Sequence, residues 1–548
     1  MATSDLSSVP ESRAGARPAP SLKQVAPFLV LPGVFLLTAL AFARVVGPFY
    51  LSYNYDPDYV YLLNGLNLAI LQSPEHIDHP GTPLQLALGL SIRLANLGAP
   101  APETAVQVLA HAESYLSAAS LVIVLLYAVV MAWVGFAVAR STRIAAAGYL
   151  VQATPFLVGD NFLLFLRVNP EPVLLLLTLL MVSALLREDA LGPSLGWRQQ
   201  VLLSFLVATG LCLKITFLPV CALVLLLKRG WKQRLRLGAL IIIWGVVWTI
   251  PIADKYPRFL GWLWGLATKR GQYGLGPSGF MTLESFFSSL VTLVWTNKFY
   301  SFTLLASLAA VVAFRLKAGV DRDRSREHER LLTCLLIGGL LQLAIGAKNP
   351  QSRYLIPTMG LLGLNWALIA LMAGKFGWLS PAPVRRVALP AGVAVTVVLL
   401  VTQQVALFRK TANNAAARME LSRVTTGQEK GARIFYYGAS SQIHALTFGT
   451  FFSGSQYYGI LHRLVDVGDC RTYLLNNWTG EFTSLRHRVQ IEDILKDGGP
   501  VYLQGDFLSD GEKALLPRSV TIVEVKRFED ERLYEIRPAS ERPPDSRP

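Results

Sequence analysis

The segment ESYLSAASLVIVLLYAVVMAWVGFAV, residues 113–138, decides the fold class of this chain. A transmembrane helix needs about 20 mostly apolar residues, and Glu113 is the only charged residue in this segment. The sequence therefore predicts a polytopic α-helical membrane protein with about eleven spans. The other ten segments that meet or approach the criterion are 26–46, 144–159, 171–186, 199–213, 216–227, 237–252, 298–315, 331–347, 355–374 and 387–408.

The composition agrees with this fold class. Of the 548 residues, 52% are apolar and 16% are charged, whereas about 25% of the residues in a soluble domain are charged. This balance excludes a disordered chain and most soluble enzymes. The net charge of +15 does not indicate a nucleic-acid binder, because the basic surplus belongs to the apolar part of the chain and the part from Arg409 onward is nearly neutral.

Lysine and arginine set the predicted orientation, because short cytoplasmic loops carry an excess of both residues. In this chain they crowd into the N-terminal leader and into alternate short loops, of which 228–236 and 315–330 are the most basic. We therefore expect the long first loop, 47–112, and the C-terminal part to lie on the extracytoplasmic side. The expected location is the bacterial inner or plasma membrane.

The hydropathy pattern divides the chain into four parts. We expect a disordered cytoplasmic leader (1–25), a transmembrane domain (26–408), an extracytoplasmic α/β domain (409–538) and a disordered tail (539–548). In the third part a polar helical connector comes first, and a partly antiparallel sheet follows. The segments that alternate like strands are 432–439, 500–507, 519–528 and 532–538.

The segment FYLSYNYDPDYVYLLNGLNLAILQ, residues 49–72, carries the main candidate for chemistry. Asp56 followed by Pro57 is typical of a helix start, so capping explains Asp56 as well as catalysis does. Asp58 is not needed for capping, and a second carboxylate can raise the pKa of its neighbour. The pair can act as a base with a positioning group, or as ligands for Mg²⁺ or Mn²⁺.

Two further polar patterns follow in the first loop. Asn64 and Asn67 lie three residues apart on one helix face, where they either bond sugar hydroxyls or form the solvated face of an interfacial helix. His76 and His79 stand in a proline-containing loop, which does not fix the geometry of a metal site. The apolar stretch after it, ending near residue 98, is too short to span and predicts an interfacial helix.

Four later connections place charged side chains at the predicted extracytoplasmic ends of spans. A single cation there is typical of an interfacial side chain whose charge reaches water. As a group around an acidic helix, such residues suit a lipid-linked phosphate or pyrophosphate, which arginine can hold by two oxygens at once. The residues are Arg167, Glu171, Lys214, Lys269, Arg270, Lys348, Arg353 and Tyr354.

The order of these motifs resembles the GT-C glycosyltransferases that use polyprenyl-phosphate sugars. The nearest type is the protein O-mannosyltransferase and lipid A aminoarabinose transferase group (family 39-like). The resemblance covers about 27–408. The motifs that carry it are DPDY (56–59), DHPGTPLQ (78–85), RVNPEP (167–172), GLCLK (210–214) and RYLIP (353–357).

The resemblance implies a GT-C-like transmembrane domain in which Asp56 is the base that acts on the acceptor. It also implies that basic residues of the outer loops, Arg353 among them, hold the carrier phosphate. The family often has two adjacent acidic residues, whereas Pro57 separates them here, so the choice between Asp56 and Asp58 stays open. The His-Pro turn continues as Gly-Thr-Pro rather than Pro-Pro-Leu, which leaves the role of His79 open.

The expected function is transfer of a sugar from a polyprenyl-phosphate donor to a lipid, glycan or protein acceptor, with inversion. Such transfer needs a base for the acceptor hydroxyl and cations for the leaving phosphate, and both kinds of residue are present. A divalent cation is the one cofactor considered. Two alternatives stay open: a transporter or flippase for a lipid-linked or anionic solute, and a polysaccharide ligase or assembly subunit. A transporter typically gathers charges near the midplane within inverted repeats, and the sequence has neither feature.

Overall fold

The computed structural model describes residues 21–51, 55–186, 196–270, 276–316, 322–375, 389–426, 431–465, 470–475, 480–484, 487–496, 498–506, 508, 513–514, 516–528 and 531–539. Within these ranges, the side chains of 22, 55–57, 322–325, 374–375, 389–401, 424–426, 465 and 470 are left out of the description. The predicted leader and tail therefore lie outside the described residues, except for 21–25 and 539. The side chain of Asp56 also lies outside them.

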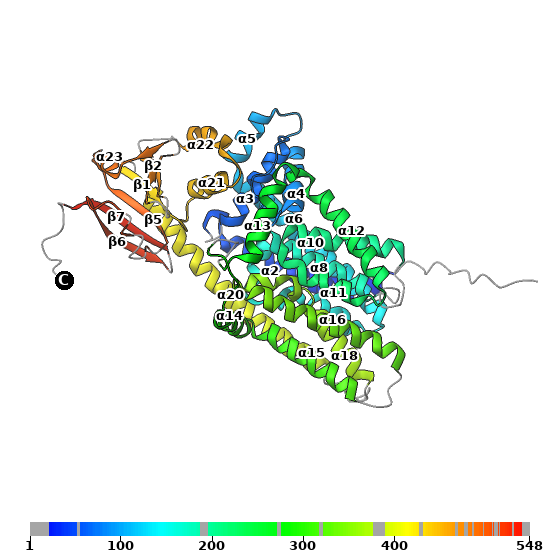
Figure 1. The fold of residues 1–548 in the computed structure, drawn as a ribbon. Coiled ribbons are helices and arrows are strands. Elements are labelled where there is room, and N and C mark those ends of the chain that lie inside the picture. The colour runs from blue at the N-terminus through cyan, green and yellow to red at the C-terminus, as the bar shows by residue number, and fades with distance from the viewer. Residues whose placement is uncertain are drawn as a thin grey trace, which may run out of the picture.

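The chain forms a helical bundle followed by a domain with a mixed β-sheet, as the sequence predicts (Figure 1). The α-helices of the bundle are α1 (Leu22–Val25), α2 (Val30–Val46), α3 (Tyr55–Ala69), α4 (Thr82–Ala95), α5 (Ala101–Ala110), α6 (Ala112–Thr142), α7 (Ala145–Gln152), α8 (Pro170–Leu185), α10 (Trp197–Leu213), α11 (Leu218–Leu227), α12 (Trp231–Thr249), α13 (Tyr256–Thr268), α14 (Leu283–Thr296), α15 (Lys298–Leu316), α16 (Arg322–Gly346), α17 (Ile356–Met359), α18 (Leu362–Lys375) and α20 (Leu389–Thr426). Short 3₁₀ helices join them: η1 (Ala26–Leu29), η2 (Phe49–Leu51), η3 (Thr154–Phe156), η4 (Gly159–Leu166), η5 (Ile215–Phe217), η6 (Ile250–Lys255) and η8 (Ser352–Leu355).

Fewer helices than predicted are long enough to cross a membrane. Each of the eleven predicted segments overlaps a helix, but several of these helices are short or bent. In the described part of the chain, the helices that qualify by length and composition are Lys23–Val46, Ala112–Thr142, Trp231–Thr268, Lys298–Leu316 and Arg326–Gly346. Two bent pairs raise the number from five to seven if each pair is one span: Ala145–Phe156 with Gly159–Leu166, and Ser352–Met359 with Leu362–Ala373. The described residues thus supply five to seven candidate spans against the expected eleven, and most of the predicted span 387–408 falls on residues whose side chains are left out of the description.

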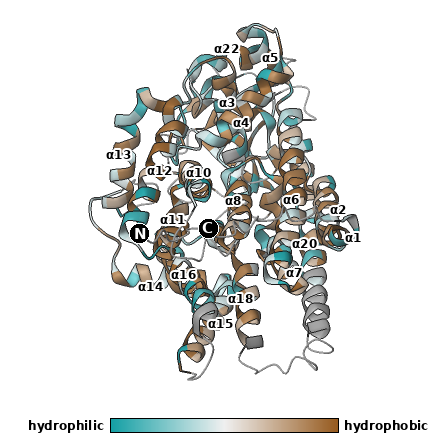
Figure 2. Ribbon diagram, turned by 90° about the vertical axis from the view of Figure 1, so that its right-hand side faces the viewer, coloured by the Kyte–Doolittle hydropathy of each residue, from teal (hydrophilic) through white to brown (hydrophobic). Residues whose placement is uncertain are grey.

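The outer surface of the bundle is apolar, as expected of helices that face lipid. Trp133 of α6 and Ile242 of α12 are more than one third exposed, and the hydropathy colours of Figure 2 show mostly hydrophobic residues along both helices. Inside the bundle, aromatic rings pack edge to face, with 5.4 Å between the ring centroids of Phe35 and Phe165. The bundle therefore has both an internal core and a lipid-facing surface.

The C-terminal domain contains one seven-stranded sheet in the order β4-β3-β2-β1-β5-β7-β6. Strand β1 runs parallel to β2 and β5, and the other pairs are antiparallel, so the predicted partly antiparallel sheet is confirmed. Four strands match predicted segments, whereas β2, β3 and β4 were missed. The elements are β1 (Gly431–Phe435), α21 (Gln442–Phe451), η10 (Ser455–Tyr457), α22 (Tyr458–Val465), β2 (Cys470–Leu475), β3 (Phe482–Thr483), β4 (Arg488–Val489), α23 (Ile491–Leu495), β5 (Val501–Asp506), β6 (Val520–Phe528) and β7 (Glu531–Pro538).

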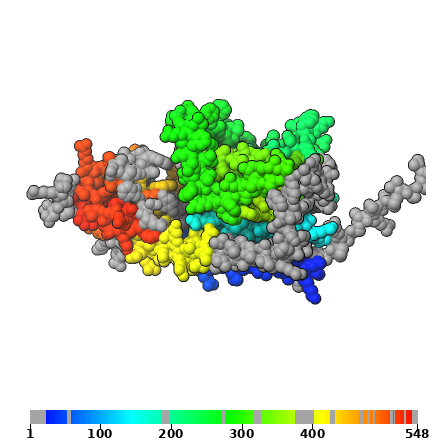
Figure 3. Space-filling view, turned by 90° about the horizontal axis from the view of Figure 1, so that it is seen from below, coloured from blue at the N-terminus to red at the C-terminus, as the bar shows by residue number. Residues whose placement is uncertain are grey.

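Helix α20 joins the bundle to this domain. It continues the last predicted span into the predicted polar connector without a break, up to Thr426. Figure 3 shows the helix in yellow along the junction between the two lobes. At the same junction, α21 packs against α3 and α22 packs against α5. The first loop and the C-terminal domain therefore lie at the same end of the bundle.

Candidate functional site

Helix α3 brings the acidic motif into the interior of the protein. From Tyr59 to Leu66 every residue is buried, because the helix packs between α4, α6 and the C-terminal domain. A Cβ atom added to Gly65 would lie 2.7 Å from the Cβ of Leu88, so glycine allows α3 and α4 to approach closely. The backbone of Asp56 lies in the first turn of this helix.

Asp58 forms a buried ion pair with Arg167. The Asp58 side chain is fully buried, and its Oδ1 also accepts a hydrogen bond of 2.5 Å from the backbone N–H of Val168. The guanidinium of Arg167 lies 5.1 Å from the centroid of the Phe49 ring and donates to the Phe49 carbonyl at 3.5 Å. Both oxygens of Asp58 are therefore engaged within the protein.

A second carboxylate, which the sequence analysis did not identify, lies next to this pair. Glu113 accepts hydrogen bonds from the Tyr59 hydroxyl and, at 2.8 Å, from the backbone N–H of Phe49. A weak signal for this residue exists in the sequence, since Glu113 is the one charged residue of the predicted span 113–138 and stands at its start. The start of α3 is thus fixed to α6 as well as to Arg167.

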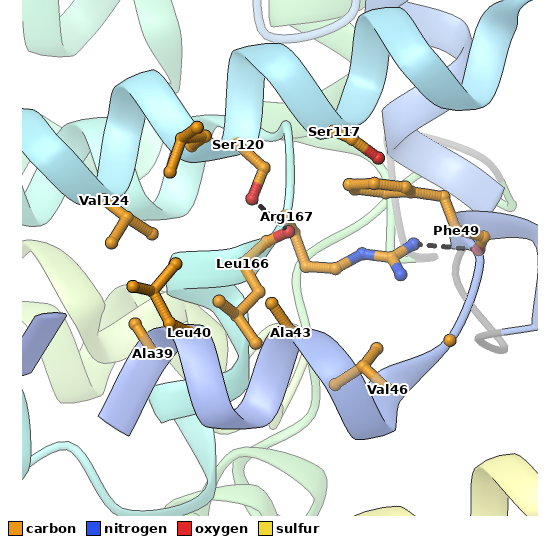
Figure 4. Close-up of a pocket in the computed structure, with 12 residues that line it drawn as sticks. Ala39, Leu40, Ala43, Val46, Phe49, Ser117, Ser120, Val124, Leu166 and Arg167 are labelled. Atoms are coloured by element: carbon orange, nitrogen blue, oxygen red, sulfur yellow. Dashed lines mark hydrogen bonds between the residues drawn. The ribbon is translucent and has the colours of Figure 1, made fainter. Parts of the chain in front are cut away.

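A small cavity reaches Arg167 from the outside of the bundle, between α2 and α6 (Figure 4). Its volume is about 120 Å³, and exposed Leu40 and Leu121 are among its lining residues. Figure 4 shows Arg167 reaching from this cavity toward the backbone of Phe49. The cavity therefore belongs to the Asp58–Arg167 pair.

The second charged group forms around Lys214, at the break between α10 and η5. The Lys214 backbone is extended there, and its ammonium lies 2.5 Å from Oε1 of Glu171 at the start of α8. Both side chains are buried. The same ammonium lies 4.8 Å from the ring centroid of Tyr354, and the Arg353 guanidinium lies 5.4 Å from that centroid. Four predicted residues from three separate segments thus meet.

Gln342 of α16 holds two of these segments together. Its amide nitrogen donates to the carbonyls of Thr216 at 3.0 Å and Tyr354 at 2.7 Å. Thr216 follows Lys214 in η5, and Tyr354 lies in η8, so one buried amide fixes the distance between the two turns. Gln342 was not predicted, because it stands among apolar residues within the predicted span 331–347.

The His-Pro turn packs against the same group. The N–H of Gly81 donates 2.7 Å to the carbonyl of Cys212, two residues before Lys214. Gly81 has φ of 65°, and an added Cβ would lie 2.5 Å from the ring of Tyr61. The His79 ring meets the ring of Trp262 edge to face, with 4.8 Å between centroids. Histidine 79 therefore faces α13 as well as the charged group.

Burial keeps both histidines of this turn neutral. Burial, and then the positive charges of Lys214 and Arg258, lower the pKa of His76 to about 4. The pKa of His79 lies well below its ordinary value, because of burial first, then the positive charge of Lys214, the neighbouring His76 ring and the positive charge of Arg353. We call His76, His79, Glu171, Lys214, Arg353 and Tyr354 the Lys214 cluster. With neutral histidines it contains two cations and one carboxylate.

The other predicted cations lie at the C-terminal end of α13 or contact it. Lys348 donates to the carbonyls of Leu266 and, at 2.9 Å, Lys269, so it anchors the end of α13. Lys269 and Arg270 are exposed at that end, beside residues 271–275, which lie outside the described ranges. Lys348 thus binds the end of α13, where Lys269 and Arg270 lie. The contacts described for the Lys214 cluster include none of these three cations.

Two basic residues of the same loop were missed. Lys255 and Arg258 pair with Glu75, at 2.8 Å and 3.3 Å, one residue before His76. Lys255 directly precedes the helix start at Tyr256 and Pro257, and Arg258 follows it; this position inside the predicted outer loop was the available signal. They tie the start of α13 to the histidine turn.

Asn64 and Asn67 face the C-terminal domain. Asn64 donates to the Phe452 carbonyl at 3.1 Å, and Asn67 donates to the Ser453 carbonyl at 2.7 Å. Both side chains are fully buried. Because both side chains are buried, the prediction that they form a solvated helix face is wrong. Their hydrogen-bonding atoms have partners within the chain, so we leave both residues out of the sugar site.

The surroundings of Asp58 do not fit a divalent cation. Its close partner is the positively charged Arg167, which would repel such an ion. In the part of the chain that the structure describes, no group of three or more His, Cys, Asp and Glu side chains could hold a metal. No step below is therefore assigned to Mg²⁺ or Mn²⁺.

Two crystal structures of ArnT from Cupriavidus metallidurans are similar to this chain. The structure bound to undecaprenyl phosphate matches with a TM-score of 0.51 and 13% identity, over 94% of this chain and 98% of that chain. The apo structure has the same TM-score and coverage at 12% identity. No model of a known protein family matches the sequence, and no curated protein does. The chain thus has an ArnT-like fold, which agrees with the resemblance that the motifs carry.

Proposed function

We propose that this chain is an integral membrane glycosyltransferase that uses a polyprenyl-phosphate sugar. The acceptor is a lipid, glycan or protein hydroxyl on the extracytoplasmic face of a bacterial membrane. The observation that carries the proposal is the Lys214 cluster, in which two cations face one carboxylate beside the helix of the acidic motif. The ArnT-like fold supports it, because one of the two matching structures was solved with undecaprenyl phosphate.

In the proposed reaction the acceptor oxygen attacks the anomeric carbon of the sugar. Its proton passes to a carboxylate of α3, and the bond between the anomeric carbon and the phosphate oxygen breaks. The electron pair leaves with the phosphate, whose charge Lys214 and Arg353 stabilise. A single displacement of this kind inverts the anomeric configuration.

We assign the base to Asp56 and a positioning role to Asp58. A base must be able to accept a proton from the acceptor, and both oxygens of Asp58 already have partners in Arg167 and Val168. Asp58 instead holds the first turn of α3 against the segment before α8. Glu171 has a similar supporting role, because its carboxylate keeps the Lys214 ammonium in place.

The first prediction tests the base. Asparagine has nearly the same size and shape as aspartate, so Asp56→Asn in the first turn of α3 should leave the thermal unfolding temperature almost unchanged. Turnover should fall by about 10²- to 10⁴-fold, the usual contribution of a general base. The assay is mass spectrometry of glycosylated product and released polyprenyl phosphate, with purified chain and a panel of polyprenyl-phosphate sugars.

The matched control is Glu103→Gln, which neutralises an exposed acid in the first turn of α5, in the same loop. It should keep the parental rate. Parental turnover in Asp56→Asn would remove Asp56 from the reaction. Absence of transfer by the parental chain with every donor of the panel would contradict the proposed function itself.

A further inference from the structure

Helix α3 is bonded to the C-terminal domain through two asparagines. Asn67 donates to the Ser453 carbonyl at 2.7 Å, and its Oδ1 accepts from the Tyr457 hydroxyl and, at 3.0 Å, from Gln456. All of these partners lie more than 380 residues away in the sequence and follow α21 directly. We call Asn64, Asn67, Phe452, Ser453, Gln456 and Tyr457 the α3 clamp.

Asn64 connects the clamp to the histidine turn. Its Nδ2 donates to the Phe452 carbonyl at 3.1 Å and to Ser453 Oγ at 3.0 Å. Its Oδ1 accepts from the backbone N–H groups of Glu75 at 2.8 Å and His76 at 3.0 Å. One buried amide therefore joins the C-terminal domain, α3 and the segment that enters the Lys214 cluster.

A second anchor holds the segment just before α3. The carbonyl of Leu51 accepts from Arg418 at 3.1 Å and from Ser440 Oγ at 3.5 Å. Ser440 is itself fixed by Glu531, which accepts from its N–H and its hydroxyl, each at 2.7 Å. The C-terminal part of the chain thus forms hydrogen bonds with residues before and after the acidic motif.

Close packing leaves α3 little room to shift. A Cβ added to Gly449 of α21 would lie 3.1 Å from the backbone carbon of Tyr59 and 3.1 Å from Leu63. Such contacts, together with buried hydrogen bonds, favour one arrangement, because any shift would leave polar groups without partners in an apolar setting.

We propose that the C-terminal domain positions the transferase site, with Asn67 and Tyr457 as positioning residues that set the place of α3 and its carboxylates. The inference rests on the proposed function for its kinetic consequence, whereas its structural consequence can be measured without any substrate. Loss of a clamp bond frees α3 while the bundle stays folded, so the acidic motif and the histidine turn lose their fixed distance to the Lys214 cluster.

The first measurement is hydrogen exchange of the full chain in detergent, with Tyr457→Phe and Asn67→Ala. Tyr457→Phe keeps the ring and removes one hydroxyl, so it should fold. Backbone amides of α3 should exchange about fivefold faster or more in both variants, the equivalent of one net hydrogen bond. The control is Asn365→Ala, a buried amide bonded to Ser307 and Leu361 within the bundle, which should leave α3 exchange unchanged.

The second measurement separates positioning from general stability. In both clamp variants kcat should fall about fivefold or more while KM for the polyprenyl-phosphate donor stays within about twofold. Unchanged α3 exchange in both variants, or an equal loss of kcat in Asn365→Ala, would overturn the proposal. If the parental chain transfers no sugar, the proposed function fails, and the exchange result alone still decides whether the clamp holds α3.

Discussion

Two buried ion pairs begin only four residues apart in the sequence, at Arg167 and Glu171, yet they differ in their surroundings. Arg167 pairs with Asp58, and further contacts of this pair include a backbone N–H, a carbonyl and the Phe49 ring. Glu171 pairs with Lys214. A second cation, Arg353, lies over the ring of Tyr354, which the Lys214 ammonium also contacts. With the Glu113 carboxylate beside it, the first pair has no positive excess, whereas the second pair has one.

The difference shows that one motif, RVNPEP (167–172), can supply one residue to a structural ion pair and another to a candidate phosphate-binding site. A buried, balanced pair is costly to break because either partner alone is an uncompensated charge. A buried group with excess positive charge gains from an anion, and a lipid phosphate supplies one. We therefore expect mutations at the first pair to act on stability and mutations at the second to act on phosphate binding.

The largest expected effect concerns the first pair. Asp58→Ala should lower the free energy of unfolding by roughly 3–5 kcal/mol, because it leaves Arg167 buried without a partner. The double variant Asp58→Leu/Arg167→Met removes both charges and should recover most of the loss. Chemical denaturation in detergent measures both. A loss below about 1 kcal/mol in Asp58→Ala would show that the pair is not the structural one.

The next largest effect concerns Arg353, which lies near the Glu171–Lys214 pair. Arg353→Ala should weaken binding of undecaprenyl phosphate by roughly 2–4 kcal/mol, about 30- to 700-fold in Kd. Arg353→Lys should recover part of the affinity, since it restores the charge without the planar fork. The control is Arg93→Ala, which changes an exposed arginine of α4 in the first loop. Equal affinity in all four proteins would remove Arg353 from the site.

The smallest effect is a pH dependence of the free energy of unfolding, which arises from His76 in the Lys214 cluster. His76 has a pKa of about 4 when folded and about 6.5 when unfolded, so the unfolded chain binds more protons between these values. Stability is therefore fully present above about pH 6.5 and is lost as the pH falls toward 4, with about 1 kcal/mol lost between pH 7 and 5.5. His76→Phe, which suits the ring contacts with Tyr61 and Phe452, should remove this part of the pH dependence. An identical pH profile in parent and variant would contradict the assignment.

Much of the fold could be predicted because local pattern determines it. Apolar runs gave the helices of the bundle, and alternation gave β1, β5, β6 and β7. The strands β3 and β4 have two residues each, which is too short for any pattern to show. Fewer helices qualify as spans among the described residues than the sequence predicts, because hydropathy does not reveal where bends such as the 77° break between Ala145–Phe156 and Gly159–Leu166 interrupt a helix.

The site was predicted less completely, because pairing across the sequence is not a local property. Lys214, Arg353 and Tyr354 were identified by type and position, and the structure brings them together with Glu171. That Arg167 pairs with Asp58 rather than acting beside Glu171 depends on packing of α3, which no spacing encodes. Asn64 and Asn67 were read from their helix face alone, and their partners belong to a domain nearly 390 residues further on.

The most direct test of the central claim compares phosphate binding by the two pairs. Affinity for undecaprenyl phosphate is measured for the parent, for Lys214→Met and for the double variant Asp58→Leu/Arg167→Met. Lys214→Met should weaken binding roughly 10- to 100-fold, the value of a hydrogen bond to a charged group, while the double variant stays within about twofold of the parent. Parental affinity in Lys214→Met together with a large loss in the double variant would contradict the account and place the phosphate at the Asp58–Arg167 pair.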